Sequence, residues 1–295
     1  MKTVSLGGVS SDSRQTVVVF ASRGSSPFRR ERLYNHPRRW LTMRISDEDG
    51  VRRVTFDRPD ARNAMTTTVA AELADAIEAL DPDTHDVCVV TGKGHAFSAG
   101  GDVQMMADRD WNAEESYEVM TTTFGRVAEA AIESSVPIVA KVNGDAVGAG
   151  MAVVAVSDFA VAVDSARFGA AFVKVGLVPD TGGTFLLPQL LGLRTAKDLA
   201  ITGRLVDADE AAKMDIVNRT VAAEELDAAV DDLVETLQKR PTRTIGLIKE
   251  GIHGNAGRGW QDALDREAML QARAYDTPEH EEGVSAFLEK REPEF

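Results

Sequence analysis

Short apolar runs that alternate with helical stretches limit the folds open to this chain. The runs that suit buried strands lie at 51–56, 87–91, 138–142 and 158–163, and a two-residue strand is expected before them at 44–45. Apolar positions at helical spacing predict a helix at 66–80. A helix between two such runs brings the chain back to the same end of a sheet. The order therefore predicts crossover units and a mainly parallel sheet covered on both faces, which is an α/β fold.

The chain becomes purely helical after residue 218. The expected helices span 222–238, 241–251, 259–275 and 278–290. Helices that cannot all cover one core often pack on a neighbouring subunit. We therefore divide the folded part of the chain into a core, 43–238, and a C-terminal helical region, 239–295.

Residues 1–42 differ from the rest in charge and pattern. Eight basic and two acidic residues give this segment a charge of +6, whereas the remaining 25 basic and 45 acidic residues give −20. The segment has no hydrophobic periodicity and is expected to be a disordered extension. A transit-like leader and a basic tail are two interpretations, and we favour a third, an upstream start with Met43 as the true first residue.

The acidic body, 43–295, argues against binding to nucleic acid or to an anionic membrane. The whole chain has only nine lysines beside its many carboxylates, a balance that suits a protein kept soluble in high salt. An ordinary acidic cytoplasmic enzyme fits the composition equally well. No apolar run approaches the roughly 18 residues needed to span a bilayer. The single cysteine, Cys88, lies in a predicted strand, which suits a reducing compartment and a structural role.

Three segments carry the strongest signal for function. They are FSAGGD at 97–102, NGDAVGAG at 143–150 and FGAAFVKVGLVPDTGGT at 168–184. Each glycine turn alone is typical of an ordinary tight turn. Together, in this order, they resemble the crotonase (enoyl-CoA hydratase/isomerase) superfamily, and the third segment is most similar to its phenylacetate-pathway isomerase branch. The resemblance covers about 43–295.

This resemblance implies a fold and an assembly. The core would be a spiral of repeated ββα turns, which periodicity alone does not predict. The C-terminal helices would build a homotrimer or a dimer of trimers.

The resemblance also implies the chemistry. Two backbone N–H groups, of Gly101 and Ala149, would stabilise the enolate oxygen of a CoA thioester. The Ala149 donor would open a helix at 150–156, whose positive end faces the developing charge.

Hydratases of the family carry two glutamates that activate water, and the matching positions are Ala152 and Phe172. Asp180 then remains as a single acid–base group, which could move a proton from C2 to C4 of an enoyl-CoA. The alternative for Asp180 is a helix N-cap before an expected helix at 185–191.

Further positions would lie near the acyl-CoA. The resemblance places Ala99, Gly101, Asp102, Val103 and Phe172 around the thioester, and Arg58, Arg62, Phe287 and Lys290 near the nucleotide. A solvated charge or a subunit contact is an equally good interpretation of the last four. Asp102 also suits a helix cap, Asp158 a partner for buried backbone, and Glu114, Glu115, Glu118 and His95 the surface. The resemblance leaves a second interpretation for the three glutamates, in which one of them reaches the pocket as a second acid.

We expect no metal and no cofactor apart from the coenzyme A of the substrate, because the histidines and the cysteine show no metal-ligand spacing. The first hypothesis is an enoyl-CoA isomerase that uses Asp180, Gly101 and Ala149. A hydratase with an unrecognised carboxylate comes next. Nucleophilic substitution by Asp180 and a catalytically silent CoA-binding trimer are the other two.

Overall fold

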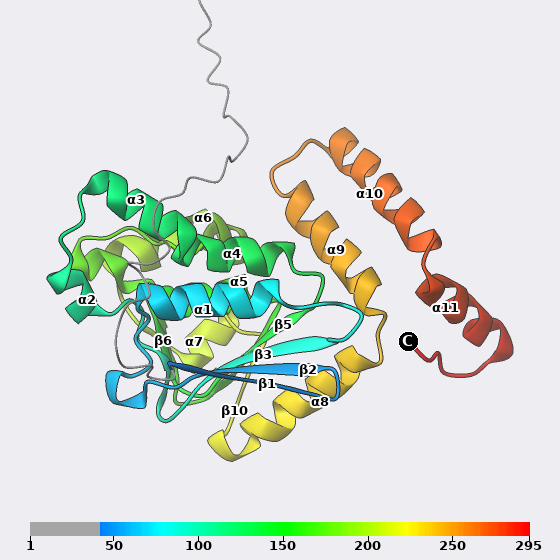
Figure 1. Cartoon of the computed structure of the whole chain (residues 1–295), viewed down its shortest axis with the longest axis horizontal. Coiled ribbons are helices and arrows are strands. Elements are labelled where there is room, and N and C mark those ends of the chain that lie inside the picture. The colour runs from blue at the N-terminus through cyan, green and yellow to red at the C-terminus, as the bar shows by residue number, and fades with distance from the viewer. Residues whose placement is uncertain (1–41) are drawn as a thin grey trace, which may run out of the picture. The chain divides into compact units, whose positions relative to one another are not determined.

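Two sheets form the centre of the computed structural model, which describes residues 42–295 (Figure 1). The larger sheet has the strand order β1-β2-β3-β5-β7-β10. Its strands are β1 (Met43–Glu48), β2 (Val51–Phe56), β3 (Val87–Gly92), β5 (Ile138–Val142), β7 (Phe159–Val163) and β10 (Arg219–Val221). Only the β1–β2 pair is antiparallel, so the predicted parallel sheet is confirmed. The strand expected at 44–45 is longer, because β1 pairs with β2 along its whole length.

The second sheet consists of short strands in the order β4-β6-β8-β9. They are β4 (Ala96–Ser98), β6 (Asp145–Val147), β8 (Arg167–Gly169) and β9 (Val206–Asp207). Each of β3, β5 and β7 is followed within a few residues by one of these strands and then by a helical segment. This repeated unit confirms the ββα spiral.

Successive turns of the spiral touch at glycine and asparagine. The Asn143 side chain accepts a hydrogen bond from the Gly92 N–H (3.0 Å) and donates one to the Gly94 carbonyl (3.0 Å). A Cβ on Gly144 would lie 2.2 Å from the His95 carbonyl oxygen, so only glycine fits there. The β5–β6 corner is thereby fixed on the β3–β4 corner.

Helices cover the sheets. They are α1 (Thr67–Glu78), α2 (Val103–Asp108), α3 (Ala113–Thr122), α4 (Phe124–Glu133), α5 (Ala149–Val156), α6 (Gly183–Thr202), α7 (Ala208–Lys213), α8 (Leu226–Gln238), α9 (Thr242–Asn255), α10 (Trp260–Tyr275) and α11 (Pro278–Glu289), with 3-10 turns at Pro59–Ala61, Ala171–Val175 and Ala223–Glu225. In Figure 1, α1 and α4 lie together above the larger sheet and α8 lies below it. The central strands are buried between them, and Cys88 in β3 is inaccessible to solvent.

The α1 prediction is confirmed, with Thr66 as its N-cap accepting from the Val69 N–H (3.2 Å). The helix expected at 185–191 is wrong in extent. α6 bends at Gly192, whose backbone is non-helical (φ 75°, ψ 156°), and then continues to Thr202. A glycine can take this conformation without ending the helical segment.

The four C-terminal helices are present, but the prediction of a purely helical chain after residue 218 is wrong. Residues 219–221 form β10, which pairs with β7, and α8 therefore begins at Leu226 instead of 222. α10 packs on α9, and Glu279 at the start of α11 accepts hydrogen bonds from the Arg243 and Thr244 N–H groups of α9 (both 3.0 Å). The predicted boundary at 238/239 falls between α8 and α9. Large apolar side chains on these helices are exposed in the single chain, namely Ile248, Ile252, Trp260, Leu264, Met269, Tyr275, Val284, Phe287 and Leu288.

No helix within residues 42–295 is both long enough and apolar enough to cross a membrane. All described residues belong to one compact unit. The hypotheses about residues 1–42 concern a segment that lies, except for its last residue, outside the described residues.

Candidate active site

The two glycine turns of the sequence motifs lie against each other. Gly100 has a φ of 92° and Gly148 a φ of 56°, both in the left-handed region. A Cβ on Gly100 would lie 2.6 Å from the Val147 carbonyl oxygen and 3.3 Å from the Ala149 nitrogen. Any side chain at Gly100 would therefore push the turns apart.

Each turn is also held by its own neighbours. The Gly100 carbonyl accepts from the Met65 N–H (2.7 Å), and the Gly148 N–H donates to the Gly169 carbonyl (2.8 Å). A Cβ on Gly150 would lie 2.5 Å from the Ser98 carbonyl oxygen, so α5 packs directly on β4. The positions of the two turns therefore depend on backbone contacts.

Two backbone N–H groups at these turns are left without an acceptor within residues 42–295. Ala149 is the first residue of α5, so no helical carbonyl lies one turn before it. At the other turn, the Met65 N–H donates to the Gly100 carbonyl, and the Met65 carbonyl accepts from the Asp102 N–H. The Gly101 N–H between them is not used within the described part of the chain. Free N–H donors at a helix start and at an adjacent turn favour an oxygen that carries negative charge. The structure thus brings the Gly101 and Ala149 turns together, and their role toward a thioester oxygen stays a prediction.

Asp180 lies in the turn before α6. Burial raises the pKa of Asp180, and the hydrogen bond from the Thr181 hydroxyl to its Oδ1 atom (2.9 Å) opposes this rise. No lysine or arginine pairs with it in the described chain. The N-cap interpretation is wrong, because Gly182 occupies the N-cap of α6 and no side chain caps that helix.

The two positions that match the water-activating glutamates are apolar and buried. Ala152 in α5 is 2% exposed, and Phe172, in the turn Ala171–Val175, is 7% exposed and belongs to the hydrophobic core. Neither offers a group that could activate water.

The first loop binds the first turn through charged groups. The Arg58 guanidinium donates to the Asp102 carboxylate (2.9 Å) and to the Ala64 carbonyl oxygen. Asp102 is confirmed as the N-cap of α2, accepting from the Met105 N–H (3.1 Å). Burial alone would raise the pKa of Asp102, but the bonds from Met105 and Arg58 outweigh it and lower that pKa. Arg58 is therefore engaged within the chain, whereas the Arg62 side chain is exposed.

Two residues that sequence analysis did not single out hold this loop. The amide of Asn63, 1% exposed and left-handed (φ 56°), donates to the Lys93 carbonyl (3.0 Å) and the Ala96 carbonyl (2.7 Å). The buried Ser98 hydroxyl donates to the Asn63 carbonyl (2.9 Å) and accepts from the Gly100 N–H (3.2 Å). An asparagine in a loop that lacks a neighbouring glycine was the available signal, because asparagine tolerates positive φ.

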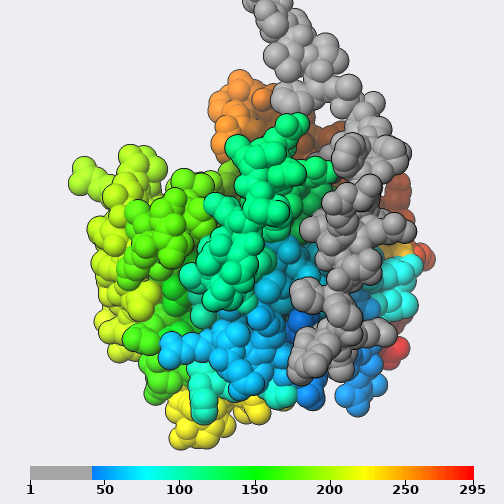
Figure 2. Space-filling model, turned by 60° about the vertical axis from the view of Figure 1, so that its left-hand side comes forward, coloured from blue at the N-terminus to red at the C-terminus, as the bar shows by residue number. Residues whose placement is uncertain are grey.

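The remaining predicted contact residues separate into two groups. Ala99 and Val103 are exposed beside the first turn. Figure 2 shows the face of the molecule on which the segments that carry α2 and α3 (blue-green) lie at the surface. Phe287 (83% exposed) and Lys290 lie at the end of α11, on the opposite side of the body from α2 in Figure 1. The single chain does not bring these last two residues to the turns.

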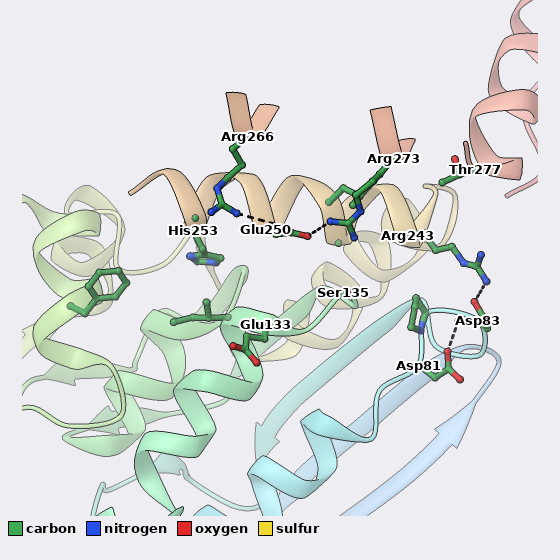
Figure 3. Close-up of a pocket in the computed structure, with 16 residues that line it drawn as sticks. Asp81, Asp83, Glu133, Ser135, Arg243, Glu250, His253, Arg266, Arg273 and Thr277 are labelled. Carbon is green, nitrogen blue, oxygen red and sulfur yellow. Dashed lines mark hydrogen bonds and ion pairs between the residues drawn. The ribbon is translucent and has the colours of Figure 1, made fainter. Parts of the chain in front are cut away.

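A groove of about 800 Å³ lies elsewhere, between α4, α9 and α10 (Figure 3). Its charged groups largely pair with one another: Arg243 with Asp83, and Glu250 with Arg266 (3.8 Å) and Arg273 (2.7 Å). None of the predicted catalytic residues lines it. The groove is therefore distinct from the site at the two turns.

Comparison with known proteins identifies the family of the chain. A model of the enoyl-CoA hydratase/isomerase family matches residues 46–295. A trans-2-decenoyl-[acyl-carrier-protein] isomerase of Streptococcus mutans is 32% identical over 84% of this chain and 95% of its own length. A 1,2-epoxyphenylacetyl-CoA isomerase of Escherichia coli is also 32% identical, over 84% of this chain and 95% of its own. The crystal structure of an enoyl-CoA hydratase from Mycobacterium smegmatis superimposes with a TM-score of 0.80 at 31% identity, covering 86% of this chain and 98% of that one.

The chain belongs to the enoyl-CoA hydratase/isomerase family, with the crotonase fold. Its members include proteins named as isomerases and proteins named as hydratases.

Proposed function

We propose that this protein is an enoyl-CoA isomerase that moves a double bond adjacent to a CoA thioester. The observation that carries the proposal is the single carboxylate of Asp180, which is unpaired by any cation in the described chain, while both water-activating positions hold buried apolar residues, Ala152 and Phe172.

The reaction needs an acidified C–H bond and one base. A carboxylate with an ordinary pKa near 3.9 is too weak to remove the C2 proton of a thioester unaided. Hydrogen bonds from the Gly101 and Ala149 N–H groups to the thioester oxygen stabilise the dienolate that forms. Burial makes Asp180 a stronger base, and the proton it takes from C2 can be returned to C4.

A hydratase is the second candidate, because the superimposed M. smegmatis structure carries that name. Addition of water needs a group that holds and deprotonates the water. With Ala152 and Phe172 buried, that group would have to come from elsewhere in the chain.

The two candidates differ in the mass of their products. The protein is incubated, in low and in high salt, with a 3-enoyl-CoA and separately with a 2-enoyl-CoA. We expect a product of unchanged mass with a shifted double bond. A product heavier by one water would support the hydratase instead. Because one relative is named for an acyl-carrier-protein substrate, the same acyl group on that carrier is a useful comparison.

Asp180→Asn tests the acid–base role. We expect turnover to fall by about 10²–10⁴-fold, the usual contribution of a positioned acid–base group. Affinity for the acyl-CoA should stay within a few-fold, because asparagine keeps the size of the side chain. Retention of full turnover would contradict the mechanism.

We also propose a homotrimer or a dimer of trimers. The support is the row of exposed apolar side chains on α9–α11, among them Trp260, Met269 and Phe287, which one chain leaves uncovered. Sedimentation equilibrium would measure the assembly, and a monomer at micromolar concentration would contradict it.

The nucleotide contacts of Arg58, Arg62, Phe287 and Lys290 remain predictions, as does the absence of a metal or a further cofactor.

A further inference from the structure

Asp180 begins a tight turn of unusual composition. The Gly183 N–H donates to the Asp180 carbonyl (2.7 Å), and the two residues between them, Thr181 and Gly182, have φ values of 51° and 78°. Two consecutive left-handed residues define a type I′ turn, for which glycine, asparagine and aspartate are preferred. Threonine at the first of these positions is the exception.

The backbone of Thr181 is strained. A left-handed conformation is unfavourable for an L-residue, and β-branched residues adopt it least readily. Strained residues persist where the surrounding structure holds them, and they cluster at functional sites. The strain at Thr181 therefore calls for a compensating role of its side chain.

Within residues 42–295, that side chain has one polar contact. Thr181 is 2% exposed, and its hydroxyl donates to Oδ1 of Asp180 at 2.9 Å. The left-handed turn directs the side chain of residue 181 back toward that of residue 180. An asparagine or glycine would relieve the strain but would not place a hydroxyl donor there.

We propose that Thr181 is a positioning residue: its hydroxyl holds one oxygen of the Asp180 carboxylate and so leaves the other oxygen free to carry the proton between C2 and C4. This inference rests on the proposed function. It predicts that the strained turn serves the acid–base group and not the packing of α6.

The hydrogen bond also has an electrostatic effect with a definite sign. A donor to the carboxylate stabilises the charged form and so opposes the effect of burial. Removal of the hydroxyl should raise the pKa of Asp180 further. Since the base must be ionised, the acid limb of the kcat/KM profile should then move to higher pH.

Thr181→Val removes the donor and keeps both the β-branched shape and the volume. We expect kcat at neutral pH to fall by about 10- to 100-fold, the factor that a hydrogen bond to a charged group is worth, and the acid limb to shift upward. Thr181→Ser keeps the hydroxyl and should stay within a few-fold of the parent, with an unchanged acid limb. Thr184→Val, an exposed position three residues on, is the matched control and should behave as the parent.

Thr181→Gly guards against a folding defect in the valine variant, because glycine accepts the left-handed backbone. It should show the same upward shift of the acid limb. If Thr181→Val or Thr181→Gly folds and keeps the parent's kcat and pH profile, the positioning role is overturned.

The Asp180→Asn variant distinguishes failure of the positioning role of Thr181 from failure of the proposed isomerase function. Full turnover in Asp180→Asn would overturn both proposals. If Asp180→Asn is impaired, adding Thr181→Val should cause little further loss, since the hydroxyl acts through the carboxylate. A full additional loss in the double variant would show that Thr181 does not act through Asp180.

Discussion

Burial makes the Asp180 carboxylate a stronger base, but the same burial destabilises the folded state. Burial disfavours its charged form, and no cation in the described chain compensates. Asp102 is in the opposite situation, because Arg58 and the Met105 N–H stabilise its charge. The pKa values of these two aspartates are thus displaced in opposite directions.

Asp180→Asn should therefore stabilise the fold at neutral pH. The pKa of Asp180 is raised in the folded state, so the folded state binds more protons than the unfolded state between the two pKa values. Stability accordingly falls as pH rises through that window and stays lower above it. The variant should melt higher than the parent at pH 7, where about 1 kcal/mol corresponds to about 2–4 °C, and the difference should vanish near pH 3.

Asp102→Asn is the control for that measurement. The lowered pKa of Asp102 means that its charge stabilises the fold above the unfolded pKa, and that this stability is lost as pH falls through the folded pKa. The variant should melt lower at pH 7 and approach the parent in acid. Thermal melting across pH measures the difference in melting temperature between each variant and the parent. Differences of the same sign for the two variants at pH 7 would contradict the argument.

At the scale of elements, a buried cation helps to attach α9 to the core. The Lys249 ammonium donates to the Asp158 carboxylate (2.6 Å) and to the carbonyls of Val136 (3.2 Å) and Ala131 (3.3 Å). Asp158 also accepts from the Ile138 N–H (2.7 Å), which confirms its predicted role as a partner of buried backbone. The C-terminal helices therefore depend on a contact between residues 91 positions apart.

Lys249→Met should destabilise the protein by about 3–5 kcal/mol, because it leaves the Asp158 charge buried without its cation. Urea unfolding would measure the change. Lys239→Met removes an exposed i,i+4 partner of Glu235 and should leave the free energy of unfolding nearly unchanged. Asp158→Asn added to Lys249→Met should recover part of the loss, and equal effects of the two lysine substitutions would contradict the buried-pair argument.

At the scale of the whole molecule, the charge of −20 on residues 43–295 opposes compaction. Many of the basic groups already sit in exposed ion pairs, such as Arg126 with Glu78 and Arg291 with Glu282, which contribute little each. Residues 43–295 hold 45 acidic but only 25 basic residues, so there are too few cations to pair with every carboxylate. Salt should therefore act mainly on the repulsion among them.

We expect the melting temperature to rise by several degrees between about 0.05 M and 1 M KCl, as the Debye length falls from more than 10 Å to about 3 Å. Sorbitol at matched osmolality is the control, because it stabilises without screening charge. A melting temperature that rises equally with both solutes, or stays flat with KCl, would favour the ordinary acidic enzyme over the salt-adapted one.

The larger sheet could be predicted from sequence because each of its central strands is a short apolar run flanked by turns. The second sheet could not, since strands of two or three residues, such as β4 and β6, carry no periodic signal. The continuation of α6 past Gly192 was missed for a similar reason, because a glycine looks the same at a bend and at a helix end.

The candidate site divides in the same way. The glycine turns and Asp180 stand out as motifs, because free N–H donors and a lone acid in apolar surroundings require particular residue types. The local role of Asp180, the engagement of Arg58 by Asp102 and the strained Thr181 hydroxyl were visible only in the folded chain. The strand and helix pattern could be predicted because it follows from which neighbouring side chains are buried. The features of the site depend on backbone angles and on contacts between segments far apart in the sequence, and only the folded chain determines these.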